Sequence, residues 1–193
     1  IVPSTPYDAK GLLKAAIRDD DPVIFLEPKR LYNGPFDGDP HKPALSWKNH
    51  ELGEVPKGHY TVPFEDARQI TEGEEVTILA YGTMVWVADA VVKEMGVNAD
   101  ILDLRSLLPL DYEAVRVTVQ KTGKIIILHE ASQTGGVGGE IAAFISEELF
   151  EYLDGPVIRV ASLDTPVPFA VELEKQFLPI DRFRAKIDLL MKY

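Results

Sequence analysis

Short apolar runs alternate with amphipathic segments along the second half of the chain. From about residue 74, runs of Val, Ile and Leu recur, and apolar residues at helical spacing follow each run. The runs predict buried strands, and the spaced residues predict helices that pack on them. The expected strands are Val76–Tyr81, Ala99–Leu104, Lys124–His129 and Pro156–Ala161. The expected helices are Met84–Met95, Pro109–Lys121, Val137–Tyr152 and Asp181–Lys192.

Strands that are apolar at successive positions are covered on both faces. The pattern therefore predicts a three-layer α/β/α fold around a mostly parallel sheet, and the domain is expected to span residues 73–193. Its crossover connections are expected to be right-handed.

A smaller unit precedes this domain. A hydroxyl residue before Pro6 is a helix-start signal, and apolar residues at helical spacing follow as far as Ile17. Pro22 ends this helix, and Val23–Leu26 is typical of a short buried strand. Because one helix and one strand cannot bury themselves, residues 1–30 are expected to end an incomplete domain. The chain also lacks an initiator Met, which indicates a piece of a longer protein.

The segment between these units, residues 31–72, is rich in Pro and Gly and shows no apolar period. Loops of this length are uncommon inside compact domains. We therefore expect an interdomain linker with an ordered insertion.

Composition excludes several classes of protein. The net charge is −11, and no cluster of Lys and Arg offers a basic face, so a nucleic-acid partner is not expected. No stretch approaches the ~20 apolar residues of a membrane helix, so no membrane partner is expected either. The absence of cysteine excludes disulfides and thiolate zinc sites.

Polar residues follow each expected strand, at the edge where open parallel sheets bind ligands. They either form a site, or they satisfy one another and face a neighbouring domain; the second interpretation is favoured because fold does not imply function. The groups are Tyr81-Gly82-Thr83, Asp103-Leu104-Arg105, His129-Glu130 and Asp164-Thr165-Pro166.

Two features of this edge have competing interpretations. The glycine-rich turn Gln133–Glu140 opens a helix, where free N–H groups could hold a phosphate, but its spacing is neither G-x-G-x-x-G nor a P-loop. A tight turn that lets the helix approach the sheet is favoured. His129 could act as a general base, although a hydrogen-bonded structural role is favoured.

An acidic run closes the first helix. Asp19, Asp20 and Asp21 stand where helix-end carbonyls are free, which suits a hard cation such as a group I or II ion. A solvated turn explains the run equally well.

Several segments, taken in order, resemble the β subunit of the decarboxylase component of thiamine-diphosphate-dependent 2-oxo-acid dehydrogenases. Each is weakly specific alone, and together they span most of the chain. They are Ala9-Lys10-Gly11-Leu12-Leu13, Ala16-Ile17-Arg18-Asp19, Pro22 through Lys29, Asp103-Leu104-Arg105-Ser106-Leu107-Leu108-Pro109, Lys121-Thr122-Gly123-Lys124, His129-Glu130-Ala131, Thr134-Gly135-Gly136 and Asp164-Thr165-Pro166.

The resemblance implies a division of labour. Residues 1–30 would end a pyrimidine-binding domain, and residues 73–193 would be a transketolase-type C-terminal domain. In this family thiamine diphosphate and magnesium lie between α and β subunits of an α₂β₂ assembly, and the catalytic Glu and His of the β subunit precede the residues matched here. No catalytic or cofactor-binding residue carries over, so this chain alone is expected to bind no thiamine diphosphate and to be inactive.

A cation and several partners follow from the same resemblance. The family's structural potassium site maps onto Ala16, Ile17, Asp19 and Asp21, although other members often have Asn where Asp21 stands. The implied partners are the α subunit, a second β subunit and the basic subunit-binding domain of the dihydrolipoyl acyltransferase. The C-terminal carboxylate joins that last contact in several members, which makes Tyr193 a candidate.

The resemblance also bears on substrate and compartment. Leu31–Gly38 is closer to bacterial branched-chain members than to the pyruvate type, so a branched-chain 2-oxo acid is preferred and pyruvate is the alternative. A bacterial cytoplasm is expected, or a mitochondrial matrix if the source is eukaryotic. Two other classes stay open: a Rossmann-like module that binds a phospho-ligand at Thr134–Gly139, and a transketolase-like enzyme acting on sugar phosphates.

Overall fold

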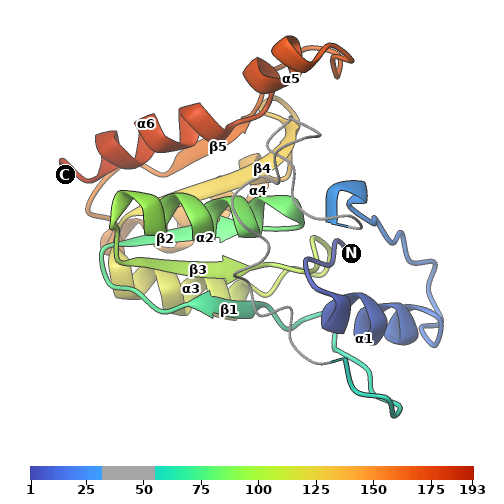
Figure 1. Ribbon diagram of the computed structural model, residues 1–193. Helices are drawn as coiled ribbons and strands as arrows, with labels where there is room; N and C mark the ends of the chain where they lie inside the picture. The colour runs from blue at the N-terminus through green and yellow to red at the C-terminus, as the bar shows by residue number, and fades with distance from the viewer. Residues whose placement is uncertain (32–54) are drawn as a thin grey trace.

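A mixed sheet of five strands forms the centre of the structure (Figure 1). The computed structural model describes residues 1–31 and 55–193. In that part of the chain the strands are β1 (Arg68–Thr71), β2 (Val76–Ala80), β3 (Ala99–Asp103), β4 (Ile125–Ser132) and β5 (Ile158–Ser162). The helices are α1 (Pro6–Ala16), α2 (Thr83–Met95), α3 (Tyr112–Thr122), α4 (Gly138–Glu148), α5 (Val171–Phe177) and α6 (Ile180–Leu190), with 3₁₀ turns η1 (Lys29–Leu31) and η3 (Phe150–Tyr152).

The strand order is β1-β3-β2-β4-β5, and every neighbouring pair except β1 with β3 is parallel. All four strands from β2 to β5 coincide with strands expected from the sequence, because their apolar runs match burial on both faces. The mostly parallel three-layer fold is therefore confirmed.

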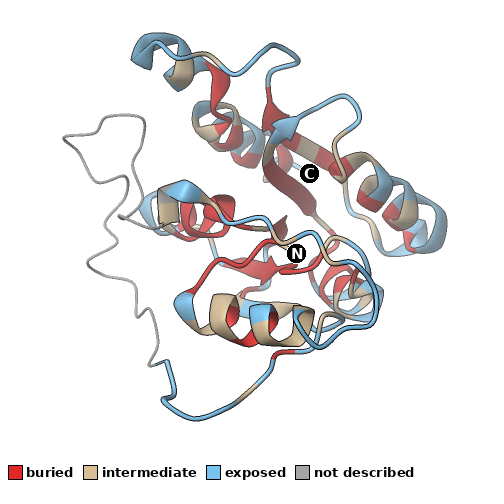
Figure 2. Ribbon diagram, turned by 90° about the vertical axis from the view of Figure 1, so that its right-hand side faces the viewer, coloured by how far each residue is buried: buried red, intermediate tan, exposed pale blue. Residues whose placement is uncertain are grey.

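Two apolar cores fill the space on either side of the sheet (Figure 2). On one face Ile78 and Phe183 belong to a core shared with α2 and α6. On the other face Leu79 and Ile127 belong to a core shared with α3 and α4. Because successive strand residues point to opposite faces, each apolar run supplies both cores at once. Burying one such side chain stabilises the fold by about 1.5–3 kcal/mol.

The boundaries of α3 show how local chemistry positions a helix. Asp111 caps its first turn by accepting the backbone N–H of Ala114 at 2.9 Å, and its other oxygen accepts the N–H of Ala67 at 2.8 Å. The helix ends at Gly123, whose φ of 67° is left-handed, and a Cβ there would meet the Asp154 carboxylate. One aspartate therefore both starts the helix and fixes the chain that enters β1.

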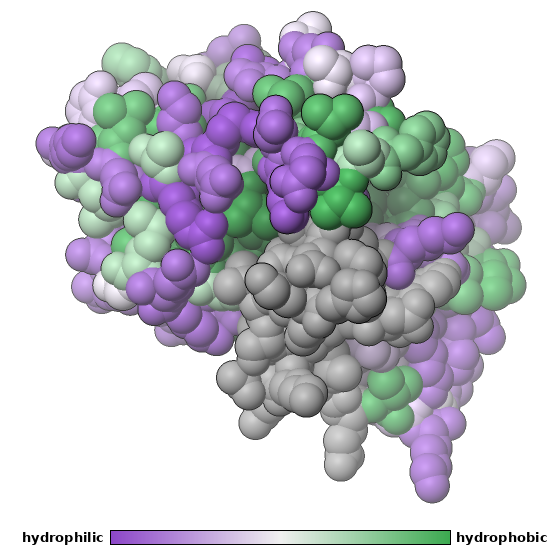
Figure 3. All heavy atoms as spheres, turned by 45° about the horizontal axis from the view of Figure 1, so that its top comes forward, coloured by the Kyte–Doolittle hydropathy of each residue, from purple (hydrophilic) through white to green (hydrophobic). Residues whose placement is uncertain are grey.

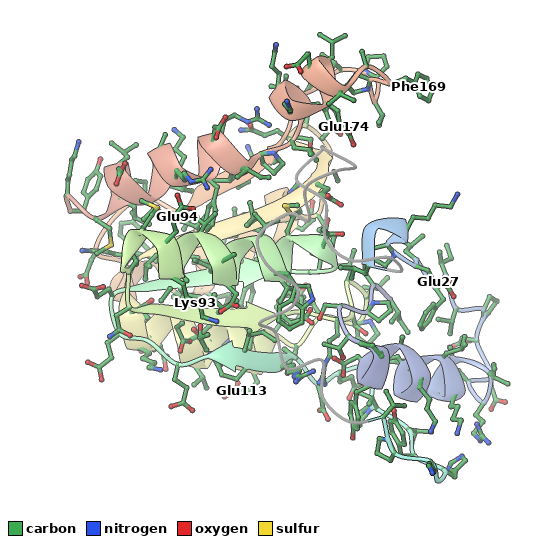
Figure 4. All side chains as sticks on the ribbon, in the orientation of Figure 1. Glu27, Lys93, Glu94, Glu113, Phe169 and Glu174 are labelled. Carbon is green, nitrogen blue, oxygen red and sulfur yellow. The ribbon has the colours of Figure 1, made fainter. Side chains whose placement is uncertain are left out.

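The closing helix α6 is held against α2 by an ion pair. Arg184 of α6 lies 2.7 Å from Glu94 of α2, which Figure 4 shows between the two helices. The preceding α5 projects from the body, and Phe169 at its approach points outward and is fully exposed.

Residues 1–28 form a small unit at the carboxyl ends of the strands, beside the main domain (Figure 1). Helix α1 forms as expected, but the strand expected at Val23–Leu26 does not: the segment is extended without a ladder, and Ile24 is 76% exposed. Its backbone meets only Ile1 among the described residues, through Leu26 N–H to Ile1 O at 2.8 Å and the Ile1 amino group to Ile24 O at 2.9 Å. A strand needs a longer partner edge than this.

Three further elements differ from expectation. Strand β1 lies inside the range expected to be linker. It is an edge strand that pairs antiparallel with β3, and its polar residues show no apolar pattern by which the sequence could predict it. The helix expected at Val137–Tyr152 ends at Glu148 and continues as η3. Helix α5 was not expected, because its seven residues carry too few apolar positions to show a period.

Candidate functional site at the carboxyl edge of the sheet

Asp103 ends β3 and is completely buried at the candidate edge. The Ser4 hydroxyl donates to one carboxylate oxygen, and the backbone N–H of Arg105 donates to the other at 3.0 Å. Burial raises the pKa of Asp103 to about 7, and these two hydrogen bonds only partly oppose that rise. The side chain therefore faces the N-terminal unit rather than an open pocket.

A second buried carboxylate lies beside it. Asp8 of α1 is inaccessible to solvent and pairs with Arg105 at 2.8 Å and with Arg68 of β1 at 3.0 Å. Thr5 caps α1 by accepting the N–H of Asp8 at 3.0 Å, which fixes the start of the helix against the sheet. Arg105 has a φ of 56°, an uncommon value for a residue with a side chain, and this turn directs its carbonyl to the N–H of Val2 at 2.7 Å.

His129 near the end of β4 is packed rather than presented to solvent. Its Nδ1 lies 3.2 Å from the carbonyl of Ala131, and its ring stacks on Tyr81 with 5.9 Å between centroids. Burial lowers the pKa of His129, which favours the neutral ring. Burial, with a smaller effect from Glu130, raises the pKa of Tyr81 to about 12. These contacts support the structural interpretation of His129.

The glycine-rich turn closes over the same ring. A Cβ at Gly136 would lie 2.7 Å from Cε1 of His129, and a Cβ at Gly138 would lie 2.6 Å from its Nε2. Thr134 anchors the turn, since its N–H and hydroxyl donate to Asp164 at 2.9 and 2.6 Å. Those hydrogen bonds lower the pKa of Asp164. The glycines let the turn approach the imidazole, which supports the tight-turn interpretation over a phosphate site.

Each of the four polar groups of this edge thus has a side chain that contacts neighbours in the same chain, although the buried Oγ1 of Thr83 and Nε of Arg105 have no hydrogen-bond partner among the described residues. The described residues do not fit thiamine diphosphate and its magnesium: the histidine is covered by the turn, and these residues contain no cluster of three or more His, Asp or Glu suited to a metal ion. What the arrangement can do is hold the N-terminal unit on the sheet.

The residues of the possible potassium site share one turn at the end of α1. The N–H groups of Ile17 and Asp19 donate to the carbonyls of Leu13 and Ala15, both at 3.0 Å. The side chain of Asp19 accepts the N–H of Asp21 at 2.9 Å; residues 17–21 are exposed, and Ala16 is half-buried. Ala16 and Ile17 precede these aspartates in the same turn, so the four candidate ligands lie close together in the sequence.

The candidate partner residue Tyr193 follows α6 and is 65% exposed. Its N–H donates to the carbonyl of Leu190 at 3.2 Å, and its ring packs near Gly155. The segment Leu31–Gly38, on which the substrate preference depended, lies outside the described residues except for Leu31.

Little in the sequence pointed to three residues that hold the N-terminal unit on this edge, Ser4, Asp8 and Arg68. Asp8 falls three residues after Thr5 and resembles an ordinary residue of a first helical turn. Arg68 lies in the range expected to be linker. The one available signal was that Asp103 and Arg105 follow a buried strand, which pointed to the edge but not to its partner.

The family described as "Transketolase, C-terminal domain" matches residues 65–182, and the family "Transketolase, pyrimidine binding domain" matches residues 1–35. The chain belongs to the transketolase C-terminal domain family, as its sequence predicted. Where the domain boundaries fall, expected at residues 30 and 73, stays a prediction.

Two relatives and one solved structure are similar to this chain over most of its length. The chain is 52% identical to the 2-oxoisovalerate dehydrogenase subunit beta of Pseudomonas aeruginosa over 89% of its length, and 42% identical to the acetoin:2,6-dichlorophenolindophenol oxidoreductase subunit beta of Bacillus subtilis over 93%. These matches cover 49% and 48% of the two relatives, so the chain spans about half of their length. A solved split-gene transketolase in an inactive β4 tetramer superposes with a TM-score of 0.72 at 25% identity, covering 99% of this chain and 56% of that one.

In the part of the chain that the structure describes, no helix has the length and apolar character needed to cross a membrane. On the face shown in Figure 3, hydrophilic residues lie among apolar ones.

Proposed function

We propose that this chain is the C-terminal assembly and docking part of the β subunit of a thiamine-diphosphate-dependent 2-oxo-acid dehydrogenase. The substrate class is a branched-chain 2-oxo acid. The observation that carries the proposal is the 52% identity to a 2-oxoisovalerate dehydrogenase subunit beta along 89% of the chain. In the complete enzyme the reaction is oxidative decarboxylation, with transfer of the acyl group to the lipoyl group of an acyltransferase.

The N-terminal unit supports a place within a larger domain. An apolar groove of about 680 Å³ lies between α1 and residues 25–31, and its lining includes Leu13, Ile17 and Phe25. Leu13 is 40% exposed and Ile17 is 73% exposed. Apolar side chains left open in this way are typical of an interface. Residues 1–35 match the pyrimidine-binding domain family, so we expect the rest of that domain to cover this groove.

The cofactors thiamine diphosphate and magnesium are assigned to the complete enzyme, between its α and β subunits, and not to this chain alone. Potassium is proposed at the turn of Ala16, Ile17, Asp19 and Asp21, where main-chain and carboxylate oxygens meet the preference of hard cations. This ion would neutralise part of the charge at the end of α1.

The partners follow from the same class: the α subunit, a second β subunit and the basic subunit-binding domain of the acyltransferase. A net charge of −11 favours a basic partner, and the exposed Tyr193 is the proposed contact. Relatives occur in bacteria and, by their names, in mitochondria. The proposed location is the bacterial cytoplasm, or the mitochondrial matrix if the source is eukaryotic.

The experiment that tests this proposal is the substrate preference of the complete parent protein with its α partner. Preference for 3-methyl-2-oxobutanoate over pyruvate is expected. Preference for pyruvate would correct the substrate alone, and no turnover of either acid with cofactor and magnesium present would contradict the proposal.

A further inference from the structure

Residues 1–17 are attached to the carboxyl edge of the sheet through the end of β3 and the start of α2. The Trp86 indole N–H donates to the carbonyl of Ser4 at 2.8 Å, and the Val2 N–H donates to the carbonyl of Arg105 at 2.7 Å. The Ser4 hydroxyl meets the Asp103 carboxyl group between these two bonds. Ser4 is 1% exposed, so the attachment excludes water.

The charges at this interface are unevenly shared. Two guanidinium groups, of Arg105 and Arg68, both form their ion pairs with Asp8. Among the described residues, Asp103 forms no ion pair although it is completely buried. A buried carboxylate without a cation is unfavourable and tends to take up a proton instead.

The titratable and charged groups that face Asp103 come from each neighbouring element. Asp8 faces it from α1, Arg68 lies opposite it on β1, and Arg105 follows two residues later, beyond the end of β3. On β2 its register partner is Ala80, which carries no charge. Burial and the negative charge of Asp8 both raise the pKa of Asp103, to about 7, against the opposing effects of Ser4 and Arg105.

We propose that Asp103 is a proton-operated latch, which holds Ser4 and with it residues 1–17 on the sheet while its carboxyl group is protonated and loosens them when that proton passes to solvent. The contact suits both states. A hydroxyl accepts a hydrogen bond from a carboxylic acid and donates one to a carboxylate, so Ser4 and Asp103 can stay hydrogen-bonded in both states. The attachment weakens on deprotonation because a negative charge is then buried at Asp103, and not because a hydrogen bond is lost.

The direction of the pH dependence follows from the raised pKa. A carboxyl group whose pKa is higher when attached than when released favours attachment at low pH. The attachment is therefore tightest below about pH 4, weakens as the pH rises toward 7, and changes little above that. Because one proton is exchanged, the equilibrium constant for release rises roughly tenfold per pH unit within this window.

The latch can be tested on the full 193-residue chain by hydrogen exchange. The chain contains two tryptophans, so a Trp47→Phe background leaves Trp86 as the single indole. The ratio of observed to intrinsic exchange rate at the Trp86 indole N–H and at the α1 amides gives the release constant. Between about pH 5 and pH 6.5 we expect this constant to rise by more than tenfold. In Asp103→Asn, which keeps the shape without the charge, we expect a change of less than about twofold.

Two further variants distinguish an effect on the attachment of residues 1–17 from a general change in the stability of the fold. Ser4→Ala should raise the release constant several-fold at about pH 5 while keeping the pH slope, because the buried carboxyl group remains. Asp100→Asn is the matched control: it removes a buried carboxylate from the other end of β3, whose partners Thr118 and Lys121 do not touch residues 1–17, and the slope should persist. A flat wild-type profile, or a slope that survives in Asp103→Asn, would overturn the latch. Since the latch uses contacts within this chain only, either result leaves the proposed substrate untouched.

Discussion

The glycine-rich turn before α4 gives a sharp test of why its glycines are there. A Cβ placed on Gly138 would lie 2.6 Å from Nε2 and 2.9 Å from Cδ2 of His129, and 3.2 Å from a methyl carbon of Ile127. Neither neighbour has a flexible end that can move away. The imidazole is fixed by its stacking on Tyr81 and by the Ala131 carbonyl, and Ile127 is fully buried in β4.

The expected effect of Gly138→Ala combines two opposing contributions. Forcing an extra methyl group into a packed core lowers stability by about 1–3 kcal/mol. Alanine in place of glycine in a helix recovers at most about 1 kcal/mol, and less at the first position. We expect a net loss of roughly 1–2 kcal/mol. The adjacent Gly139→Ala is the matched control, because its Cβ would meet nothing closer than Arg159 at 3.6 Å, and it should be neutral or slightly stabilising.

Urea unfolding of the two variants, analysed with a common dependence on denaturant, measures this difference. The clash should also shrink when the ring is removed, so Gly138→Ala in a His129→Ala background is expected to lose less than Gly138→Ala alone. Equal stability of the two single variants, or an undiminished loss without the ring, would refute close contact as the reason for the glycine.

Two other predictions concern the N-terminal unit. Asp8→Ala should lower the free energy of unfolding by about 3 kcal/mol, because it leaves two guanidinium groups without their buried partner. Glu113→Ala is the control, since Glu113 of α3 is exposed and its loss should change the free energy of unfolding little. Similar effects of the two substitutions would contradict the buried ion pairs. If Asp19 and Asp21 help to hold potassium, the complete parent protein should melt at a higher temperature in potassium than in sodium chloride of equal concentration, and Asp21→Ala should abolish that difference; identical melting in both salts would argue against the site.

The strands that were predicted well are those whose burial depends on their own residues. Runs such as Val76–Ala80 and Ile125–Leu128 are buried at every position and apolar at all but Thr77, and a parallel sheet covered on both faces favours that pattern. Strand β1 was missed for the converse reason, because an edge strand needs only backbone pairing with β3 and tolerates Arg68 and Gln69. Apolar composition also led to a wrong prediction at Val23–Leu26, where, among the described residues, the run pairs only with Ile1.

The edge of the sheet shows a second limit. The pattern located Asp103, Arg105 and His129 at the strand ends, because the carboxyl ends of parallel strands share one edge. It could not show that Ser4 and Asp8 would fill that edge, since contacts about a hundred residues apart in sequence leave no local period. For this reason the choice between an open site and an internal interface depended on the structure.

The proposal that this chain belongs to the β subunit of a branched-chain 2-oxo-acid dehydrogenase is best tested by measuring kcat/KM of the complete parent protein with its α partner. Turnover of 3-methyl-2-oxobutanoate and of pyruvate is compared at equal thiamine diphosphate and magnesium, with cofactor-free enzyme as the control. We expect cofactor-dependent turnover with a clear preference for the branched acid. Absence of cofactor-dependent decarboxylation of either acid would contradict it.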